Sequence, residues 1–267
     1  MSNSTSALVT LTSPRSEPRP ERRMAGSVVA PGTLSSGDRD VMYRLLETYF
    51  AGTSRAQFES DLAEKECAIL LRDAESGQIQ GFSTSMRLTT QVDGETIVAF
   101  FSGDTIVARE YWGDTLLSRL WSHTVFSAAD RILAANAAAR VYWFLICSGY
   151  RTWRFLPVFF REFYPNPDTA TPPRVQKLMD ALGRQKFGDQ YLPGAGVVRF
   201  RSAAPLRPGI SDVTDERLHD PFVAFFARMN PGHVRGDELA CLTEVSRANL
   251  TRAGARMVAG GAKLIEG

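Results

Sequence analysis

The pattern of apolar and polar positions along the chain is centred on one long strand and the helix that follows it. Residues 96–107, TIVAFFSGDTIV, are mostly β-branched and aromatic, which predicts a buried strand. A turn containing Gly113 comes next, and Leu116, Leu117 and Leu120 then repeat at helical spacing. The first N–H groups of a helix lack internal partners and lie at the positive end of the helix dipole. We therefore expect this turn to suit an anionic ligand.

Short helices and strands are predicted ahead of the central strand. Apolar spacing indicates helices over 38–50 and 55–65 and strands over 67–71 and 79–88. Asp93-Gly94 separates the last of these strands from the central strand and is the strongest hairpin signal in the chain. Residues 1–37 are rich in Ser, Thr, Pro and Arg, so we expect a disordered tail there.

The elements after the central turn are mainly helical. The same patterns predict, in chain order, helix 114–133, strand 141–147, helices 152–163 and 174–186, strand 197–202 and helices 215–229 and 237–253. This order predicts a mixed α/β fold, with a mostly antiparallel central sheet flanked by helices and one parallel crossover. We expect one domain over 38–203, followed by a helical C-terminal extension over 204–267.

Composition narrows the functional classes. The chain has 267 residues, of which 44% are hydrophobic and 22% charged, as in an ordinary globular protein. A net charge of +2 is too balanced to indicate nucleic-acid binding. The three cysteines are far apart in sequence and match neither a disulfide framework nor a metal spacing, which favours a reducing cytoplasm. The longest apolar run near the N-terminus is too short for a membrane span.

The central turn resembles that of the GNAT superfamily of acyl-CoA-dependent N-acyltransferases, and the resemblance covers about residues 38–200. In that family a valine-ended strand leads to Arg or Gln, Gly, any residue, Gly, any residue, then Gly or Ala. Here the strand ends at Val107 and the six positions read WGDTLL, so only Gly113 matches. Trp112 replaces the basic residue, Thr115 the second glycine and Leu117 the small residue. The chain also resembles uncharacterised bacterial proteins that share FSGDTIV and GYRTWRFLPVFF.

The resemblance implies a reaction and a binding site. An acyl group would pass from CoA, or from a carrier-protein phosphopantetheine thioester, to a small-molecule or peptide amine by direct attack, without a metal. The residues implied in donor binding are Val107, Tyr111, Trp112, Gly113, Asp114, Thr115, Leu116 and Leu117. A backbone N–H near Val107 would polarise the thioester carbonyl. Asp114 conflicts with this role, because a carboxylate at a helix start competes with a phosphate.

Two residues are candidates for proton transfer. Asp104 is an acid in an otherwise apolar strand, three residues before Val107, where burial should raise its pKa and suit it to act as a base. The alternative is a structural aspartate at the Gly103 bend. Tyr164 is the candidate proton donor to the leaving thiolate, by analogy with a family tyrosine, and the alternative is a packed tyrosine.

Other polar groupings have simpler interpretations. His233, Asp237 and Glu238 form a cluster that predicts helix capping rather than a metal site. The aromatic run 153–164 either lines an acyl tunnel or forms a core helix. Arg151, Arg154 and Arg161 either form one anion-binding helix face or are solvated. A second interpretation of the whole chain is a GNAT-like domain that has lost catalysis and binds a ligand or a protein, with an acyl carrier protein as one possible partner.

Overall fold

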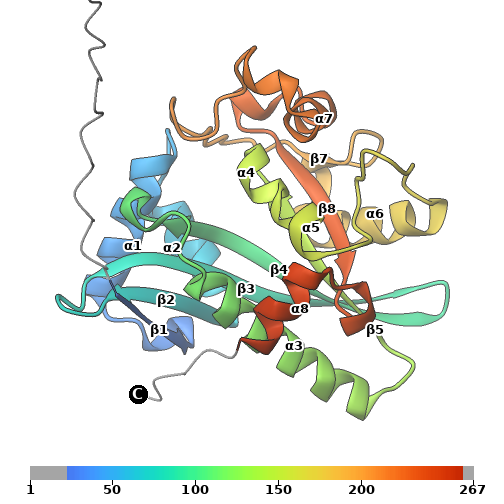
Figure 1. Ribbon diagram of the computed structural model, residues 1–267, viewed down its shortest axis with the longest axis horizontal. Helices are drawn as coiled ribbons and strands as arrows, with labels where there is room; N and C mark the ends of the chain where they lie inside the picture. The colour runs from blue at the N-terminus through green and yellow to red at the C-terminus, as the bar shows by residue number, and fades with distance from the viewer. Residues whose placement is uncertain (1–22, 261–267) are drawn as a thin grey trace, which may run out of the picture.

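A single eight-stranded sheet runs through residues 23–260, which are the residues that the computed structural model describes (Figure 1). The strands are β1 (Met24–Val29), β2 (Cys67–Asp73), β3 (Ile79–Val92), β4 (Glu95–Val107), β5 (Arg140–Cys147), β6 (Tyr191–Leu192), β7 (Val197–Val198) and β8 (Glu238–Glu244). Their order across the sheet is β1-β2-β3-β4-β5-β8-β7-β6. Every neighbouring pair is antiparallel except β4–β5, which is parallel.

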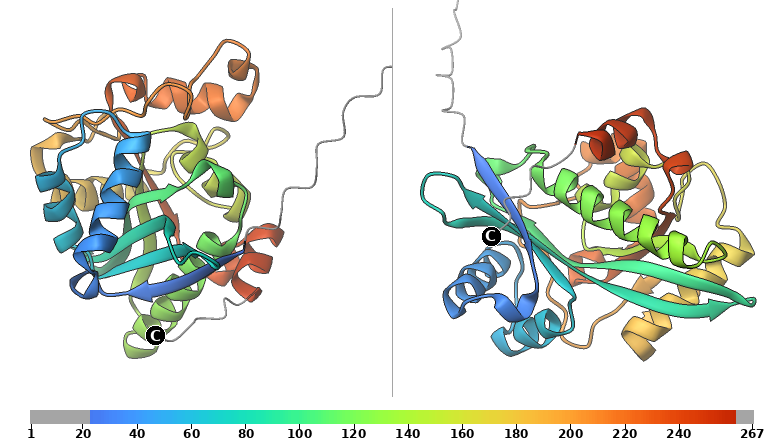
Figure 2. Two further views of the ribbon diagram at one scale, coloured as in Figure 1. Left: turned by 90° about the vertical axis from the view of Figure 1, so that its left-hand side faces the viewer. Right: turned by 90° about the horizontal axis from the view of Figure 1, so that it is seen from below.

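Helices cover both faces of this sheet (Figure 2). The α-helices are α1 (Ser36–Tyr49), α2 (Arg55–Ala63), α3 (Leu116–Ala135), α4 (Tyr150–Trp153), α5 (Phe155–Phe159), α6 (Pro173–Phe187), α7 (Pro221–Met229) and α8 (Arg252–Ala259). The helices α3, α4, α5 and α7 pack against one face through the largest apolar cluster. On the other face α6 packs against the middle of the sheet, and α1 and α2 pack against β2, β3 and the end of β4. The predicted mixed α/β fold with a mostly antiparallel sheet and a helical C-terminal part is confirmed.

The hairpin between β3 and β4 forms as predicted. Asp93 and Gly94 both have positive φ, at 52° and 79°, which a two-residue hairpin turn of this kind requires. Val92 pairs with Glu95 on either side of the turn, and the register continues along both strands. The hairpin therefore sets the register of β4 as far as Ser102, which is opposite Ser85.

The N-terminal and C-terminal parts of the sheet differ from expectation. Residues 23–37 are not a tail, because β1 pairs along the outer side of β2; residues 1–22 lie outside the described residues. Gly26 of β1 packs on α3, and a Cβ there would lie 2.2 Å from a methyl carbon of Leu120. The helix predicted over 237–253 is wrong: β8 occupies its first half, between β5 and β7. Five consecutive buried residues make a strand with this pattern difficult to distinguish from a buried helix.

The aromatic segment after β5 is also shorter and more broken than predicted. Instead of one helix over 152–163, α4 ends at Trp153 and α5 begins at Phe155. Proline at position 157 has no N–H for the carbonyl of Trp153, and its ring crowds that carbonyl. The predicted strand 197–202 is likewise reduced to Val197–Val198. The short α4 therefore starts immediately after β5, close to the end of the central strand.

Candidate active site

The two parallel strands at the centre of the sheet diverge before they end. Pairing of β4 with β5 runs from Ile97 opposite Arg140 to Ser102 opposite Leu145. β4 then continues for five residues, to Val107, and β5 for two, to Cys147. The hydroxyl of Ser102, in the last pair, accepts hydrogen bonds from the indoles of Trp121 and Trp143 at 3.3 and 2.9 Å. The two strands are therefore paired up to Ser102 and Leu145 and separate beyond this pair.

A β-bulge bends β4 at the point of divergence. Ser85 of β3 is opposite Ser102, and Ser83 is opposite Thr105, so the single residue Thr84 faces two residues of β4. Those two residues are Gly103 and Asp104. A Cβ at Gly103 would lie 2.6 Å from the hydroxyl of Thr84, so a larger residue would disturb the bulge. Bulges redirect strands and side chains, and this one places Asp104 at the start of the opening.

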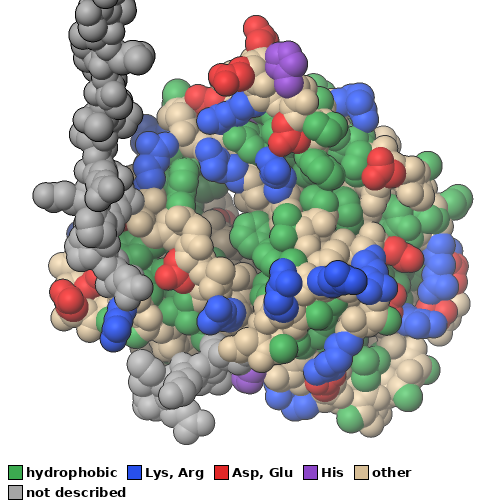
Figure 3. Space-filling model, viewed as in Figure 1, with side chains coloured by type: hydrophobic (Ala, Val, Ile, Leu, Met, Phe, Trp, Pro, Cys, Tyr) green, Lys and Arg blue, Asp and Glu red, His purple; other side chains and the backbone are tan. Residues whose placement is uncertain are grey.

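The opening is visible as a hollow in the surface of the molecule. Figure 3 shows it between the turn that follows β4 and α4, with basic side chains gathered along its upper rim. Among residues 23–260 no pairing joins β4 to β5 beyond Ser102 and Leu145, so the facing backbone groups of the two strand ends have no partner strand there. A ligand there would contact β4, the turn after it and the first residues of α4.

Asp104 has the environment expected of a proton acceptor. Its side chain is half-buried, and burial raises its pKa to about 6, against the opposing positive charge of Lys65. The ammonium group of Lys65 donates a hydrogen bond to the carbonyl of Asp61 at 2.7 Å, at the end of α2. Within residues 23–260, no ion pair involves the Asp104 carboxylate. Its charge is therefore not neutralised by direct contact with a cation of the described chain.

A second carboxyl group lies at the same end of the sheet and was not assigned this place from the sequence. Glu238 begins β8, and Leu239 beside it pairs with Cys147 at the end of β5. Burial raises the pKa of Glu238 to about 8; a hydrogen bond with Ser148 opposes this rise, and the negative charge of Asp104 adds to it. The signal that would have revealed Glu238 is an acid at the first position of a buried strand, which the helix prediction obscured.

The turn after β4 is held by the side chains of aromatic residues and contains one glycine. Trp112 folds back so that its indole N–H donates to the carbonyl of Val107 at 2.8 Å. Tyr111 is buried, and its hydroxyl donates to Asp73 at the end of β2. Gly113 has a φ of 98°, is exposed, and has open space where a side chain would point. Only this glycine of the predicted motif is therefore required by the backbone itself.

The start of α3 is partly occupied by the protein's own acid. The Asp114 carboxylate accepts a hydrogen bond from the N–H of Leu116 at 2.6 Å, while Arg119 N–H reaches the carbonyl of Thr115 at 3.0 Å. Among the described residues, the N–H groups of Leu117 and Ser118 have no hydrogen-bond acceptor. The side chains of Val107, Leu116 and Leu117 pack against the core instead of lining the turn. Two backbone donors thus remain for an anion.

Two arginines flank Trp112, and a third lies against Tyr150 at the start of α4. The guanidinium groups of Arg109 and Arg151 lie 5.2 and 5.1 Å from the centre of its ring. Arg109 donates to the carbonyl of Gly209, and Arg151 to that of Ile210. Arg217 lies 5.9 Å from the centre of the Tyr150 ring. Within the described chain, none of these three arginines forms an ion pair with a carboxylate.

Several predicted residues do not join this arrangement. Tyr164 pairs with Leu242 on the side of β8 that faces away from β5, with both backbone hydrogen bonds at 2.8 Å, so β5 and β8 separate it from β4. Arg154 forms an ion pair with Asp220 at 2.8 Å. Arg161 follows the end of α5, so it does not share a helix face with Arg151. The structure brings Asp104 and the turn to one end of β4 and leaves these three residues elsewhere.

The sequence cluster near His233 is divided among separate partners. A ring nitrogen of His233 lies 2.9 Å from the carbonyl of Asn230, and Asp237 pairs with Arg199 at 2.8 Å. Across residues 23–260, no group of three or more His, Cys, Asp or Glu side chains is arranged to hold a metal ion. No helix in the same part of the chain is both long and apolar enough to cross a membrane.

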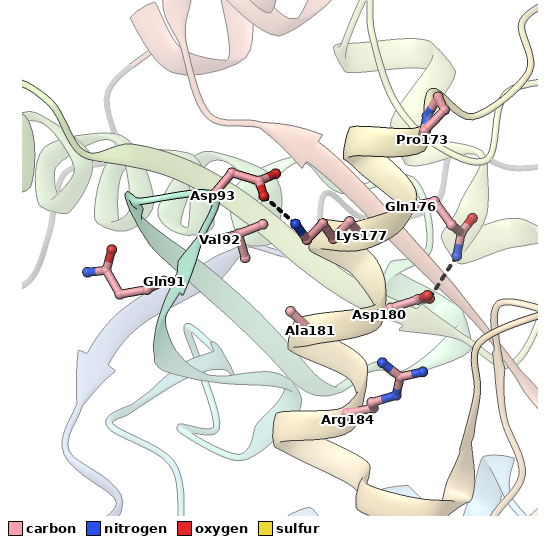
Figure 4. Close-up of a pocket in the computed structure, with 9 residues that line it drawn as sticks. All are labelled: Gln91, Val92, Asp93, Pro173, Gln176, Lys177, Asp180, Ala181 and Arg184. Carbon is pink, nitrogen blue, oxygen red and sulfur yellow. Dashed lines mark hydrogen bonds and ion pairs between the residues drawn. The ribbon is translucent and has the colours of Figure 1, made fainter.

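A separate surface groove of about 610 Å³ lies at the other end of β4 (Figure 4). It runs between the hairpin tip and α6. Asp93 of the hairpin forms an ion pair with Lys177 of α6, and Gln176 donates a hydrogen bond to Asp180 within α6. Along the strand, Asp93 and Asp104 are about 35 Å apart at the usual rise per residue. This groove is therefore distinct from the opening beside Asp104.

Comparison with known proteins gives matches only among solved structures. No family model and no curated protein matches the chain. A probable N-acyltransferase from Enterococcus faecalis matches at 13% identity and a TM-score of 0.39, over 53% of this chain and 33% of that one. A GNAT-family N-acetyltransferase from Escherichia coli, solved with CoA, matches at 20% identity and a TM-score of 0.34, over 52% of this chain and 71% of that one. Glucosamine-6-phosphate N-acetyltransferase from Arabidopsis thaliana matches at 13% identity and a TM-score of 0.33, over 49% of this chain and 88% of that one.

These matches concern the fold alone. The match spans about a third of the length of the Enterococcus protein. The three identities are at most 20% and the three TM-scores at most 0.39, so the matches carry no argument about the family or the chemistry of this chain. The resemblance to the GNAT superfamily stays a prediction from the sequence.

Proposed function

We propose that the protein is an N-acyltransferase that moves an acyl group from CoA, or from the phosphopantetheine of a carrier protein, to an amine. The observation that carries this proposal is the opening between β4 and β5, with the bulge and the half-buried Asp104 at its edge. An extended pantetheine arm can lie between two diverging strands and use their unpaired backbone groups. The acceptor would be a small-molecule or peptide amine.

The donor phosphates would lie at the turn after β4. The free N–H groups of Leu117 and Ser118 point out of the start of α3, where the helix dipole favours an anion. Arg109 and Arg151 add positive charge from both sides of Trp112. The arginines would offset the negative charge of Asp114, which already holds the N–H of Leu116. Charge from side chains would thus supplement the two backbone donors that remain.

The chemical step would be direct attack of the amine on the thioester. The amine nitrogen bonds to the carbonyl carbon, the carbon–sulfur bond breaks, and the thiolate leaves and takes up a proton. A backbone N–H on the open side of β4, near Val107, would stabilise the negative charge on the carbonyl oxygen. Asp104 would accept a proton from the amine or position the water that does so. Tyr164 is not included in this set, because it lies beyond β5 and β8.

One observation favours a second function, the binding of a ligand without catalysis. The carboxylate of Asp114 occupies one of the N–H groups that a phosphate would use, and Gly113 is the one glycine of the motif that is kept. A protein that has lost its donor-binding turn could still bind a ligand or a protein in the opening. The two functions differ in whether thiol is released.

The test combines ligand binding with thiol release. Thermal unfolding would be measured with CoA, acetyl-CoA, a long-chain acyl-CoA and pantetheine, because a ligand at about 100 times its dissociation constant adds roughly 2.7 kcal/mol. Gly113→Val should abolish the stabilisation. Gly77→Val is the matched control, because Gly77 also has positive φ and open space around it but lies in the β2–β3 turn.

The outcomes separate the candidates. Stabilisation by acyl-CoA together with amine-dependent thiol release, weakened in Asp104→Asn, supports the transferase. Stabilisation with no thiol release from any amine supports the binding protein. If none of the four ligands raises the unfolding temperature, free CoA is not the donor, and the same assays are repeated with an acylated carrier protein.

A further inference from the structure

We infer that the acceptor binds as a primary ammonium ion between Asp104 and Glu238, and that Glu238 takes its proton while Asp104 positions it. This inference rests on the proposed acyl transfer and assigns a second carboxyl group to it. Glu238 would be a catalytic residue, because it contacts the reacting nitrogen. Asp104 would then act through its charge and geometry.

The register of the sheet brings the two carboxyl groups to the same level. Ser102 is opposite Leu145 in the last β4–β5 pair, and Asp104 follows two residues later, after the extra residue of the bulge, so it lies level with the last residues of β5, Ile146 and Cys147. Cys147 in turn is opposite Leu239 of β8, directly after Glu238. The two acids therefore lie on either side of the end of β5, at the point where β4 has separated from it.

Neither carboxyl group is neutralised by the protein. No ion pair joins Asp104 or Glu238 to a basic side chain in the part of the chain that the structure describes. The nearest basic group is Lys65, whose charge acts on Asp104 and whose ammonium already donates to the carbonyl of Asp61. Buried carboxylates are costly without a cation. A positively charged ligand would complete this arrangement.

An unpaired hydroxyl marks the same place independently. Thr84 is only 3% exposed, and its hydroxyl has no hydrogen-bond partner among residues 23–260. It points at the bulge, 2.6 Å from where a Cβ of Gly103 would lie. Buried hydroxyls are nearly always paired, so an unpaired one beside Asp104 indicates a donor or acceptor that the chain itself does not supply.

The electrostatics give the two acids different roles. Burial raises the pKa of Asp104 to about 6 and that of Glu238 to about 8, where the charge of Asp104 contributes. Near pH 7, Asp104 is therefore ionised and can hold an ammonium ion, whereas Glu238 is mostly protonated. Other charged or polar groups around the pair are Lys65 and Asp61 from the end of α2, the Lys186–Glu64 pair between α6 and α2, Ser148 after β5 and the Arg199–Asp237 pair beside β8.

The arriving ammonium ion changes this balance. Its positive charge lowers the pKa of Glu238, which releases its proton to solvent and becomes the acceptor. One N–H proton of the ammonium then moves to the Glu238 carboxylate, and the freed lone pair attacks the thioester carbon. As the carbon–sulfur bond breaks, the second proton of the nitrogen goes through solvent to the thiolate, and Glu238 keeps the proton that it took from the ammonium, which restores its protonated resting state. Atoms and charges balance without a further reactant.

The first experiment measures proton release when an amine binds. Calorimetric titration of the CoA complex with spermidine and with a short peptide bearing a free N-terminus, at pH 7 in two buffers of different ionisation enthalpy, gives the number of protons released. We expect close to one proton per amine for the wild type and none for Glu238→Gln. Glu244→Gln is the matched control, at the other end of β8, and should behave as the wild type.

The second experiment follows the pH dependence. In the wild type, kcat/KM for the amine should rise with pH through an apparent pKa near 8. Asp104→Asn should move this rise to lower pH, since it removes the negative charge that raises the pKa of Glu238, and should increase KM at least tenfold. Glu238→Gln should remove the rise and lower kcat at least a hundredfold. Transfer that persists in Glu238→Gln with an unchanged pH profile overturns the inference and leaves the proposed transferase intact.

A third measurement does not depend on activity. Carboxyl ¹³C NMR titration would follow Glu238 in the free wild-type protein and in Asp104→Asn. A Glu238 resonance that titrates near its ordinary value of about 4.3, or that does not shift in Asp104→Asn, overturns the inference whatever the protein's activity. Absence of both CoA binding and thiol release, with the expected titration of Glu238, would instead overturn the proposed acyl transfer, and with it the catalytic assignment.

Discussion

The guanidinium group of Arg151 lies 5.1 Å from the centre of the Trp112 ring and joins α4 to the turn that follows β4. The two residues are on opposite sides of the opening between β4 and β5, so their contact crosses its mouth. The guanidinium group of Arg151 also donates a hydrogen bond to the carbonyl of Ile210 at 2.9 Å. The contact therefore ties together three segments that are distant in sequence, and it places a positive charge where donor phosphates would enter.

Arg151→Ala should weaken the binding of CoA. A charge-assisted hydrogen bond to phosphate contributes on the order of 1.5 kcal/mol, so the dissociation constant should rise about tenfold. Pantetheine lacks the phosphates, and its weaker binding should not change. Calorimetric titration of both ligands provides the measurement. Arg201→Ala is the control, because Arg201 is exposed and pairs with Asp189 away from the turn. Equal loss for CoA and pantetheine would show that Arg151 acts through structure alone.

Ser102→Ala should destabilise the fold at the last paired position of β4 and β5. The Ser102 hydroxyl accepts from both Trp121 and Trp143, and its removal leaves two buried indole N–H groups without an acceptor. We expect a loss of about 2 kcal/mol in the free energy of unfolding, since an unsatisfied buried donor costs about 1–3 kcal/mol. Urea unfolding followed by tryptophan fluorescence tests this. Ser102→Thr, which keeps a hydroxyl, should lose less than Ser102→Ala if the hydrogen bonds are the cause.

Thr84→Val and Gly103→Ala should affect the stability of the protein differently. Thr84→Val removes a buried hydroxyl that has no partner, so stability should stay the same or rise by about 1 kcal/mol. Gly103→Ala places a methyl 2.6 Å from the Thr84 hydroxyl and should cost about 1–3 kcal/mol through overpacking. Chemical unfolding of both variants gives the comparison. A destabilised Thr84→Val would mean that the hydroxyl does have a partner, such as a bound water.

Much of the fold can be predicted from local sequence pattern, and the elements that are predicted wrongly have physical reasons. The hairpin at Asp93-Gly94 and the crossover from β4 to β5 depend on signals a few residues long, and they are as predicted. In β8, burial on both faces removes the alternation that identifies a strand, so its sequence pattern predicts a helix. β1 has one glycine and one serine among six residues, and only pairing with β2 makes it a strand.

The candidate site was predictable only where one segment carries it. Asp104 stands out because it is an acid inside a long apolar strand, and its raised pKa agrees with that expectation. The sequence predicts a capping role for Glu238 and not a place at this site, because that place comes from the neighbouring position of β5 and β8, which are over ninety residues apart. The same holds for Arg217, which lies against Tyr150 although the two residues are 67 positions apart in the sequence.

Asp104→Asn should stabilise the protein at neutral and alkaline pH. The pKa of Asp104 is about 6 in the folded state against 3.8 for the ordinary group, so the unfolded chain ionises first and the ionised carboxylate destabilises the fold. This free-energy cost begins as pH rises above about 4, is complete above about 6 and amounts to roughly 3 kcal/mol. Asparagine has no charge and avoids it. The free energy of unfolding of the variant should therefore exceed that of the wild type at pH 8 and match it near pH 3.5.

Urea unfolding at pH 3.5, 5, 6.5 and 8 would measure this difference, with Asp189→Asn as the control, since Asp189 is exposed and its substitution should give a small offset with no such rise. A constant difference between wild type and Asp104→Asn at all four pH values would mean that the asparagine changes packing and not ionisation. A wild type that is more stable at pH 8 would mean that Asp104 is paired with a cation in solution, because pairing lowers the pKa of a carboxyl group. The expected sign therefore tests directly whether the carboxylate at the opening is unpaired in the absence of a ligand.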